Sequence, residues 1–361
     1  MIFLKKNFYR WLPFYAFRRL QKPFWRQRRP VHILFCFVDH FEPMWGGADR
    51  ATETARVAAW VERYPVVTRG HRDHDGVPPR HTFFYPEEEY RPEHLDALAG
   101  LCRQGFGEVE IHLHHDNDTG PALRKKLETF KTRLIQHGHL ANNRVTGECR
   151  YGFIHGNWAL DNSHPEGRWC GVNDEITILK ETGCYADFTL PSSPGEAQTK
   201  KINSIYYATD DPRRPNSHNT GLDVRVGGRE SGDLMIIQGP LALDWRRRKI
   251  ECGAIEYYDP PEPHRVKRWV EEAIHVRGRP EWVVVKVYTH GTVEANRDLL
   301  LGPPFERFLS HMEEWYNDGK DYVLHYVTTR ELYNIIKAAE DGREGDPGAY
   351  RNYRLGSIWA I

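Results

Sequence analysis

Short apolar runs and amphipathic segments alternate along most of the chain, which has 361 residues. Residues 31–43 open with a continuous apolar run, as a buried strand does, and residues 121–138 place apolar side chains at helical spacing. The same two patterns recur to the end of the chain. They predict further strands at 81–86, 108–114, 151–158, 185–191, 233–240, 281–291 and 322–328, and further helices at 91–105, 173–183, 263–278, 304–319 and 328–342.

Strands that alternate with helices in this way predict an α/β fold with a largely parallel sheet and covering helices. A (β/α) barrel is a common solution for a domain of this length. We find no internal repeat and no second core, so residues 31–361 are predicted to form one domain. Within it, residues 195–233 are rich in Gly, Pro, Asn and Asp and predict a long excursion, a feature that is usually functional.

Residues 1–30 differ from the rest of the chain, because they interleave Lys and Arg with Phe, Tyr and Trp and contain no acidic residue. No apolar run here has the ~20 residues that a bilayer span needs, and none has the form of a signal peptide. Two interpretations stay open: an arm that contacts an anionic membrane face, or an arm packed on the domain or on a second subunit. We expect the protein in the cytoplasm or on the cytoplasmic face of the membrane.

The charge balance argues against one class of function. The chain has 50 basic and 50 acidic residues, whereas a dedicated nucleic-acid-binding protein carries a net basic surface. Its six cysteines include no Cys-x-x-Cys pair and do not form a disulfide framework pattern, which indicates a reducing compartment. The 19 histidines are many, and their positions are informative because histidine is the commonest metal ligand and a frequent acid or base.

Polar side chains collect where predicted strands end. Asp39 and His40 end the first predicted strand, the stretch EVEIHLHHDND spans the end of the third, and His290 ends a later one. In parallel α/β folds, chemistry gathers at the carboxyl ends of strands. Any one of these groups alone is more often a solvated edge or a structural histidine than a site. Their repeated position at strand ends favours a common centre.

His112 and His114 are two residues apart on a predicted strand, so both imidazoles face the same side. With His40, and with Asp116 or Asp118, they form a candidate metal shell. Histidine and carboxylate ligands suit zinc, and also iron, cobalt, nickel or manganese.

An ion with an open coordination position would hold a water molecule and lower its pKa, which makes the water a nucleophile. Asp39 is a candidate for the base that takes a proton from that water. His290 is a candidate for the acid that protonates the leaving group. This set of residues predicts a metal-dependent hydrolase.

Four segments resemble, in order, the motifs of the polysaccharide deacetylase superfamily. FCFVDHFEP stands where that family has a strand ending T-F-D-D-G, and HTFFYP followed by EIHLHHD stands where it has A-T-F-F and then E-I-G-x-H-(S/T)-x-x-H. ILKETGCYADFTLPSSP is similar to its segment L-x-x-x-G-(F/Y)-x-Y-D-x-S, and VVVKVYTHG is similar to its last strand. The resemblance covers residues 31–330 and implies a deformed (β/α) barrel with about seven parallel strands.

By position, the resemblance also implies a divalent metal, with zinc as the first candidate. His112 matches the family's first metal histidine, and Asp116 stands where the second belongs unless His114 takes that place. His40 stands where the family has a metal-binding aspartate. The chain therefore departs from the family's ligand set while keeping residues that can bind a metal.

The resemblance assigns roles to other residues as well. Asp39 matches the family's base, and His290 matches the histidine that assists the leaving group. The family's arginine motif is replaced by RYGFIHGNW, in which Arg150 fits approximately and His155 is the alternative. His155 and Trp158 are therefore candidate substrate-binding residues.

The function implied by the resemblance is hydrolysis of the amide bond of an N-acylated sugar or polysaccharide intermediate, with a carbohydrate and no nucleic acid as the partner. Two alternatives stay open. One is a glycoside hydrolase on the same barrel, which needs two carboxylates, and the other is a protein that binds or assembles glycans without turnover. Three tryptophans near strand ends are candidates for stacking on sugar rings or for simple loop packing. They are Trp45, Trp158 and Trp169.

Overall fold

The computed structural model describes residues 8–21 and 29–359, and the strands in these ranges form one large sheet and one small hairpin. The strands are β1 (Val31–His40), β2 (His81–Pro86), β3 (Gly107–Leu113), β4 (Ala141–Asn142), β5 (Cys149–His155), β6 (Cys184–Asp187), β7 (Ile205–Ala208), β8 (Leu222–Asp223), β9 (Leu234–Ile237), β10 (Ala242–Asp244), β11 (Lys249–Glu251), β12 (Trp282–Thr289) and β13 (Tyr322–Val327). Neighbours in the large sheet follow the order β12-β1-β2-β3-β5-β6-β9-β7-β8, with β13 also beside β1 and β4 beside β5.

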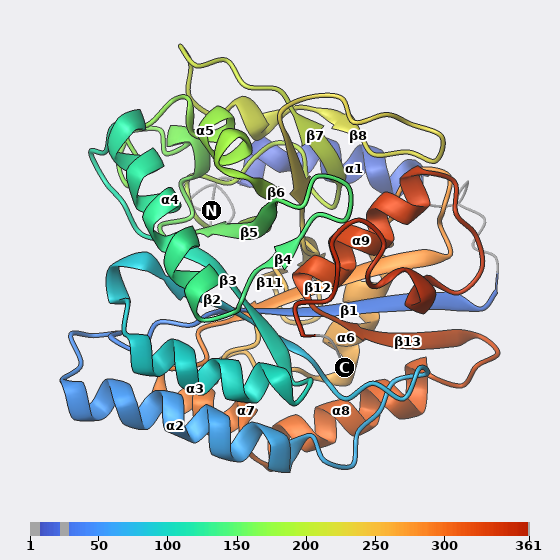
Figure 1. The fold of residues 1–361 in the computed structure, drawn as a ribbon. Coiled ribbons are helices and arrows are strands. Elements are labelled where there is room, and N and C mark those ends of the chain that lie inside the picture. The colour runs from blue at the N-terminus through green and yellow to red at the C-terminus, as the bar shows by residue number, and fades with distance from the viewer. Residues whose placement is uncertain (1–7, 22–28, 360–361) are drawn as a thin grey trace.

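Helices lie on both faces of the large sheet (Figure 1). They are α1 (Phe8–Gln21), α2 (Arg50–Val67), α3 (Pro92–Arg103), α4 (Gly120–Gln136), α5 (Glu175–Thr182), α6 (Pro263–Glu271), α7 (Glu294–Leu300), α8 (Pro303–Tyr316) and α9 (Thr329–Glu340). In Figure 1, α2, α3 and α8 lie together at the bottom, whereas α9 lies on the other side of β1. The predicted α/β fold with a largely parallel sheet is confirmed.

Alternate residues of β1 face two different hydrophobic cores. Phe35 and Phe37 pack into the core that includes side chains of α2, α3 and α8. Cys36 and Val38 pack into the core that includes side chains of α9. Because successive side chains of a strand point to opposite faces, β1 is buried on both sides, as central strands of parallel sheets are.

The sheet does not close into a barrel. Most of its strands run parallel to their neighbours, but β7 is antiparallel to both β9 and β8. Within residues 29–359, no strand pair joins β12 to the β7–β8 end of the order. A side chain links β12 to the segment just beyond β6, because the Lys286 ammonium donates hydrogen bonds to the carbonyls of Phe188 and Leu190.

Several elements were not predicted from sequence: α1, α2, α7, β4, β7, β8, β10 and β11. Two of them show why. The first is α2, which was not predicted although Val57, Trp60 and Tyr64 form a buried stripe on it. Its start is set by Asp49, whose side chain accepts a hydrogen bond from the first turn. The second is β7, which lies inside the excursion at 195–233 and is only four residues long. A run this short is defined as a strand by its ladder with β9 rather than by its own pattern.

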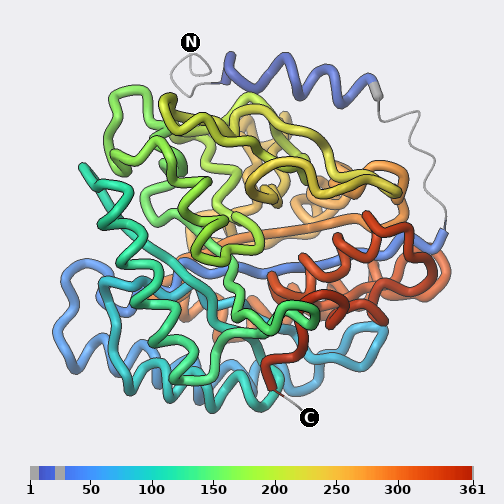
Figure 2. Tube along the Cα trace, turned by 45° about the horizontal axis from the view of Figure 1, so that its top comes forward, coloured from blue at the N-terminus to red at the C-terminus, as the bar shows by residue number. Residues whose placement is uncertain are grey.

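Helix α1 packs on the excursion and runs along the top of the molecule in Figure 2. Trp11 is fully buried, and the Arg19 guanidinium lies 3.1 Å from the Glu272 carboxylate. The described part of the arm is thus packed on the domain, and membrane contact stays a prediction. Residues 1–7 and 22–28 of that arm lie outside the described residues. Three large apolar side chains of α1 remain exposed: Tyr9, Phe17 and Leu20.

None of the described helices is both long enough and apolar enough to span a membrane.

Candidate metal centre

Four histidines surround Glu42 at the carboxyl ends of β1, β3 and β12. Glu42 follows β1, and its Oε1 atom lies 3.1 Å from His112 Nε2 and 3.4 Å from His114 Nε2. One ligand atom from each of these three residues lies within 4.8 Å of the other two, and the same holds for His40, Glu42 and His290. These five residues are called the Glu42 cluster below.

His112 has a hydrogen-bond acceptor at each ring nitrogen. Its Nδ1 atom lies 3.1 Å from the carbonyl oxygen of Ile154, and its Nε2 atom faces the Glu42 carboxylate. Burial lowers the pKa of His112, against the opposing effect of Glu42, and so favours the neutral ring, which carries a single N–H. One proton cannot serve both acceptors, whereas a cation between Nε2 and Glu42 would satisfy the second. A carbonyl at Nδ1 is also the usual outer partner of a metal-bound histidine.

His114 lies between two carboxylates, Glu42 at Nε2 and Glu88 at Nδ1. Burial lowers its pKa, but the hydrogen bonds to Glu42 and Glu88 outweigh burial and raise the pKa to about 10. Hydrogen bonds from His112 and His114, against the effect of burial, hold the pKa of Glu42 well below its usual range. The cluster therefore favours a positive charge at this point, which a proton or a divalent ion can supply.

The backbone of Gly156 presses on the His114 ring. A Cβ atom at this position would lie 2.4 Å from the imidazole, and the Gly156 N–H donates to the Leu113 carbonyl at 2.8 Å. Only the absence of a side chain lets β3 and the segment after β5 approach this closely. Gly156 thus sets the orientation of His114.

His40 ends β1 on the face opposite to Asp39. It is 1% exposed, and neither ring nitrogen makes a hydrogen bond within the described residues. Its ring stacks on Trp158 at 4.5 Å and lies 4.8 Å from the rings of His112 and His290. Burial, reinforced by the neighbouring histidines, lowers its pKa well below the ordinary value. A neutral imidazole with an unused lone pair on one nitrogen can bind a metal or accept a proton.

His290 follows β12 and is held by a carboxylate. Its Nδ1 atom lies 2.8 Å from Glu256 Oε1, and the Asn296 side chain donates to Glu256 and to the His290 carbonyl. Burial lowers the pKa of His290, but the hydrogen bond to Glu256 outweighs this and raises it. The pair can therefore hold a proton facing the cluster, as a general acid must.

Asp39 is not brought to the cluster. It points to the other face of β1, where His81 Nε2 lies 2.8 Å from Oδ2 and the Gly291 N–H donates to Oδ1 at 2.6 Å. Its carboxylate is fully buried beside Trp60. The physical reason is strand alternation, which turns neighbouring residues of β1 to opposite faces.

Asp116 and Asp118 also lie outside the cluster. Asp116 is exposed, and its carboxylate accepts hydrogen bonds from the backbone N–H of Trp169 at 2.6 Å and of the next residue. Asp118 accepts from the Lys126 ammonium at 2.7 Å and lies 3.3 Å from His115 Nδ1. The chain turns away from the cluster after His114, so neither aspartate can join it.

The two candidate substrate-binding residues are separated. Trp158 borders the cluster through its stack on His40, whereas His155 is fully buried in a second group with other side chains.

Three glutamates that belong to the cluster or contact its histidines were not assigned from the sequence: Glu42, Glu88 and Glu256. Glu42 carried a signal, since it lies two residues beyond His40 at a strand end. Glu256 carried none, because it comes from an irregular segment.

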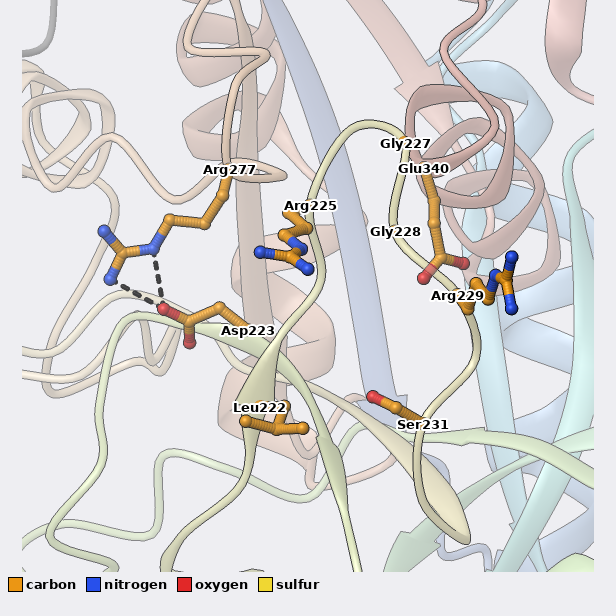
Figure 3. Close-up of a pocket in the computed structure, with 9 residues that line it drawn as sticks. All are labelled: Leu222, Asp223, Arg225, Gly227, Gly228, Arg229, Ser231, Arg277 and Glu340. Atoms are coloured by element: carbon orange, nitrogen blue, oxygen red, sulfur yellow. Dashed lines mark hydrogen bonds and ion pairs between the residues drawn. The ribbon is translucent and has the colours of Figure 1, made fainter.

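A pocket of about 570 Å³ lies elsewhere and is lined mostly by residues of the excursion (Figure 3). Arg225, Arg229 and Arg277 line it together with two carboxylates. The Arg277 guanidinium lies 2.6 Å from the carboxylate of Asp223, so part of the positive charge is already neutralised. The residues that line the pocket include no histidine or cysteine.

No protein-family model matches the chain, and no match was found among curated proteins.

Proposed function

We propose that the protein is a metal-dependent hydrolase that removes the acyl group of an N-acylated sugar, on an open version of the deacetylase-type barrel. The observation that carries this proposal is the convergence of Glu42, His112 and His114 on one point, with an acceptor at each ring nitrogen of His112. The His290–Glu256 pair beside them adds a proton donor. The resemblance in motif order supports the same reaction class.

Glu42, His112 and His114 would hold the ion, and zinc suits one carboxylate and two imidazoles. A bound divalent ion would supply Lewis-acid chemistry to the acyl carbonyl and to water. Glu88 would fix the His114 ring from behind, as outer carboxylates do for metal-bound histidines.

The remaining residues of the cluster would move protons. Water adds to the acyl carbon, the C–N bond breaks, and the amine leaves with a proton from His290. We assign the proton from water to His40 rather than Asp39, because the His40 nitrogens have no hydrogen bond while both Asp39 oxygens accept one. The products are a carboxylate and a free amino sugar.

Aromatic side chains border this centre, as a sugar site requires. Trp45 is 48% exposed and its ring lies 5.8 Å from that of His290, and Trp158 lies on the other side of His40. Their faces would support a sugar ring beside the acid. This favours a carbohydrate over a peptide as the substrate.

The test uses the zinc-loaded full-length protein and a panel of N-acetylglucosamine oligomers. Acetate and free amine should appear in equal amounts, and Glu42→Gln should abolish both. Glu313→Gln is the matched control, because Glu313 also pairs with a histidine at 3.0 Å but lies outside the cluster. New reducing ends without acetate would indicate a glycoside hydrolase. Binding that survives metal removal, with no turnover, would indicate a glycan-binding protein and overturn the proposal.

A further inference from the structure

A second group of metal-competent side chains adjoins the Glu42 cluster. It contains His115 just after β3, His155 at the end of β5, Cys170 in the following loop and Glu175 at the start of α5. One ligand atom from each lies within 4.8 Å of the other three, and all four residues are buried. These residues are called the His155 cluster below.

The spacing within the His155 cluster fits one small ion. Glu175 Oε1 lies 3.1 Å from His115 Nε2, and Oε2 lies 3.4 Å from Cys170 Sγ and 3.9 Å from His155 Nε2. Zinc bonds of ~2.0–2.3 Å at tetrahedral angles put neighbouring ligand atoms about 3.3–3.6 Å apart. Oε2 also accepts the Asp161 N–H at 2.6 Å, which fixes the carboxylate plane.

His155 provides the independent evidence for a ligand. It is 0% exposed, and neither of its ring nitrogens makes a hydrogen bond within the described residues. A buried polar group without a partner is costly and rare in native proteins. An ion between its ring and the other three side chains would satisfy it.

Further contacts support the ligands from outside. Asp118 lies 3.3 Å from His115 Nδ1, on the far side of the ring from Glu175. Two backbone N–H groups, of Asn162 and Val172, point at the Cys170 sulfur at 3.3 and 3.4 Å. A carboxylate behind a histidine and N–H groups on a sulfur are typical outer partners of metal ligands, because they orient the ring and stabilise thiolate charge.

We propose that His115, His155, Cys170 and Glu175 bind one divalent ion of the zinc class in a closed tetrahedral site. Binding displaces the Cys170 thiol proton to solvent, and the charges of thiolate and carboxylate balance the ion within the buried site. Four protein ligands leave no position for water, so the role is structural. The proposal does not depend on the reaction at the Glu42 cluster.

The ion would hold the segment 156–174 in place against the ends of β3 and β5. This segment holds non-glycine residues in the left-handed region, which the surrounding structure must maintain. They are Trp158 (φ 62°), Asp161 (φ 53°), Asn162 (φ 51°) and Trp169 (φ 69°). Because Trp158 stacks on His40, a metal in the His155 cluster would also fix one wall of the Glu42 cluster.

The experiment loads the full-length protein with cobalt(II) and records its absorption spectrum. A thiolate-to-cobalt charge-transfer band is expected in the wild type, because the His155 cluster contains a cysteine and the Glu42 cluster does not. Cys170→Ala should abolish the band and remove one of two bound ions. Cys184→Ala, which replaces another buried cysteine outside both clusters, should leave the band and the ion count unchanged.

Persistence of the band in Cys170→Ala, or its absence from the wild type with cobalt bound, would overturn the proposal. If Cys170→Ala does not fold, X-ray absorption at the zinc edge of the wild type decides the question. One sulfur ligand for every two bound ions is expected when both clusters are loaded, and no sulfur ligand overturns the site. Neither readout requires activity, so failure here is distinguishable from failure of the proposed hydrolase.

Discussion

His114 and His115 are neighbours in the chain, but they belong to clusters that differ in access to solvent. The His114 side chain is 31% exposed and that of His115 is 0% exposed. The Glu42 cluster contains two partly exposed histidines, His114 and His290, and adjoins the exposed Trp45, whereas all four residues of the His155 cluster are buried. Catalytic zinc sites keep an open position and structural sites are closed. On the two proposals, one strand end would supply a ligand for chemistry and, one residue later, a ligand for stability.

The largest effect is expected for His290, which the proposed reaction uses as an acid and not as a ligand of the ion in the Glu42 cluster. His290→Gln should lower the deacetylation rate about 10²–10⁴-fold, the range for loss of a general acid, with the number of bound ions unchanged. The measurement is the initial rate of acetate release beside metal content by mass spectrometry. His71→Gln, which alters another histidine paired with a glutamate, should leave the rate as it is. An unchanged rate in His290→Gln would remove His290 from the mechanism.

A smaller effect is expected where the backbone orients a ligand. Gly156→Ala should push the His114 ring aside and weaken ion binding at the Glu42 cluster about 10–100-fold, as loss of an orienting contact does. Titration with zinc against a competing chelator measures the affinity. Gly70→Ala is the control, since a Cβ there meets no atom within 4 Å. Equal weakening of the cobalt–thiolate site would show that the two clusters are not independent.

The rate of metal removal should also distinguish the clusters. A chelator should take the ion from the Glu42 cluster first, because His114 is partly exposed, and from the buried His155 cluster later. Loss of activity should therefore precede loss of the cobalt–thiolate band when both are followed in one sample. A single phase for both signals would contradict the distinction between an open and a closed site.

The smallest effect provides a baseline for the dependence of stability on pH, against which the two clusters can be compared. His139 belongs to neither, and burial lowers its pKa to about 4 although the Leu95 carbonyl oxygen, 2.9 Å away, acts against this. Its folded-state pKa lies below the ordinary value of about 6.5, so the unfolded chain binds more protons between these values. The free energy of unfolding should fall as pH drops through this window.

His139→Gln should remove one proton from that uptake and lessen the fall by about 1.4 kcal/mol per pH unit. Urea unfolding of wild type and variant at several values between pH 6.5 and 4, without added metal, measures it. Identical slopes would mean that the pKa of His139 is the same in the folded and unfolded chains, and would contradict the prediction.

The sequence alone determined most of the strands and helices. It also determined that the side chains of His112 and His114 point to the same face of their strand. They depend on hydrophobic period and on strand alternation, which involve residues close in the chain. The position of His40 and His290 at strand ends was predictable for the same reason. The sequence did not reveal α2, where the buried stripe is interrupted by charge, or β7, which is short.

Only the tertiary structure decided which carboxylates complete the clusters. Alternation turned Asp39 toward His81, while Glu42, beyond the end of β1, reached the histidines. Glu256 and Glu175 come from segments far away in sequence, and their places depend on packing between elements rather than on local pattern. Openness of the sheet between β12 and β7–β8 was decided in the same way. Local periodicity specifies which face a residue takes, but contacts across long sequence separation specify what it meets there.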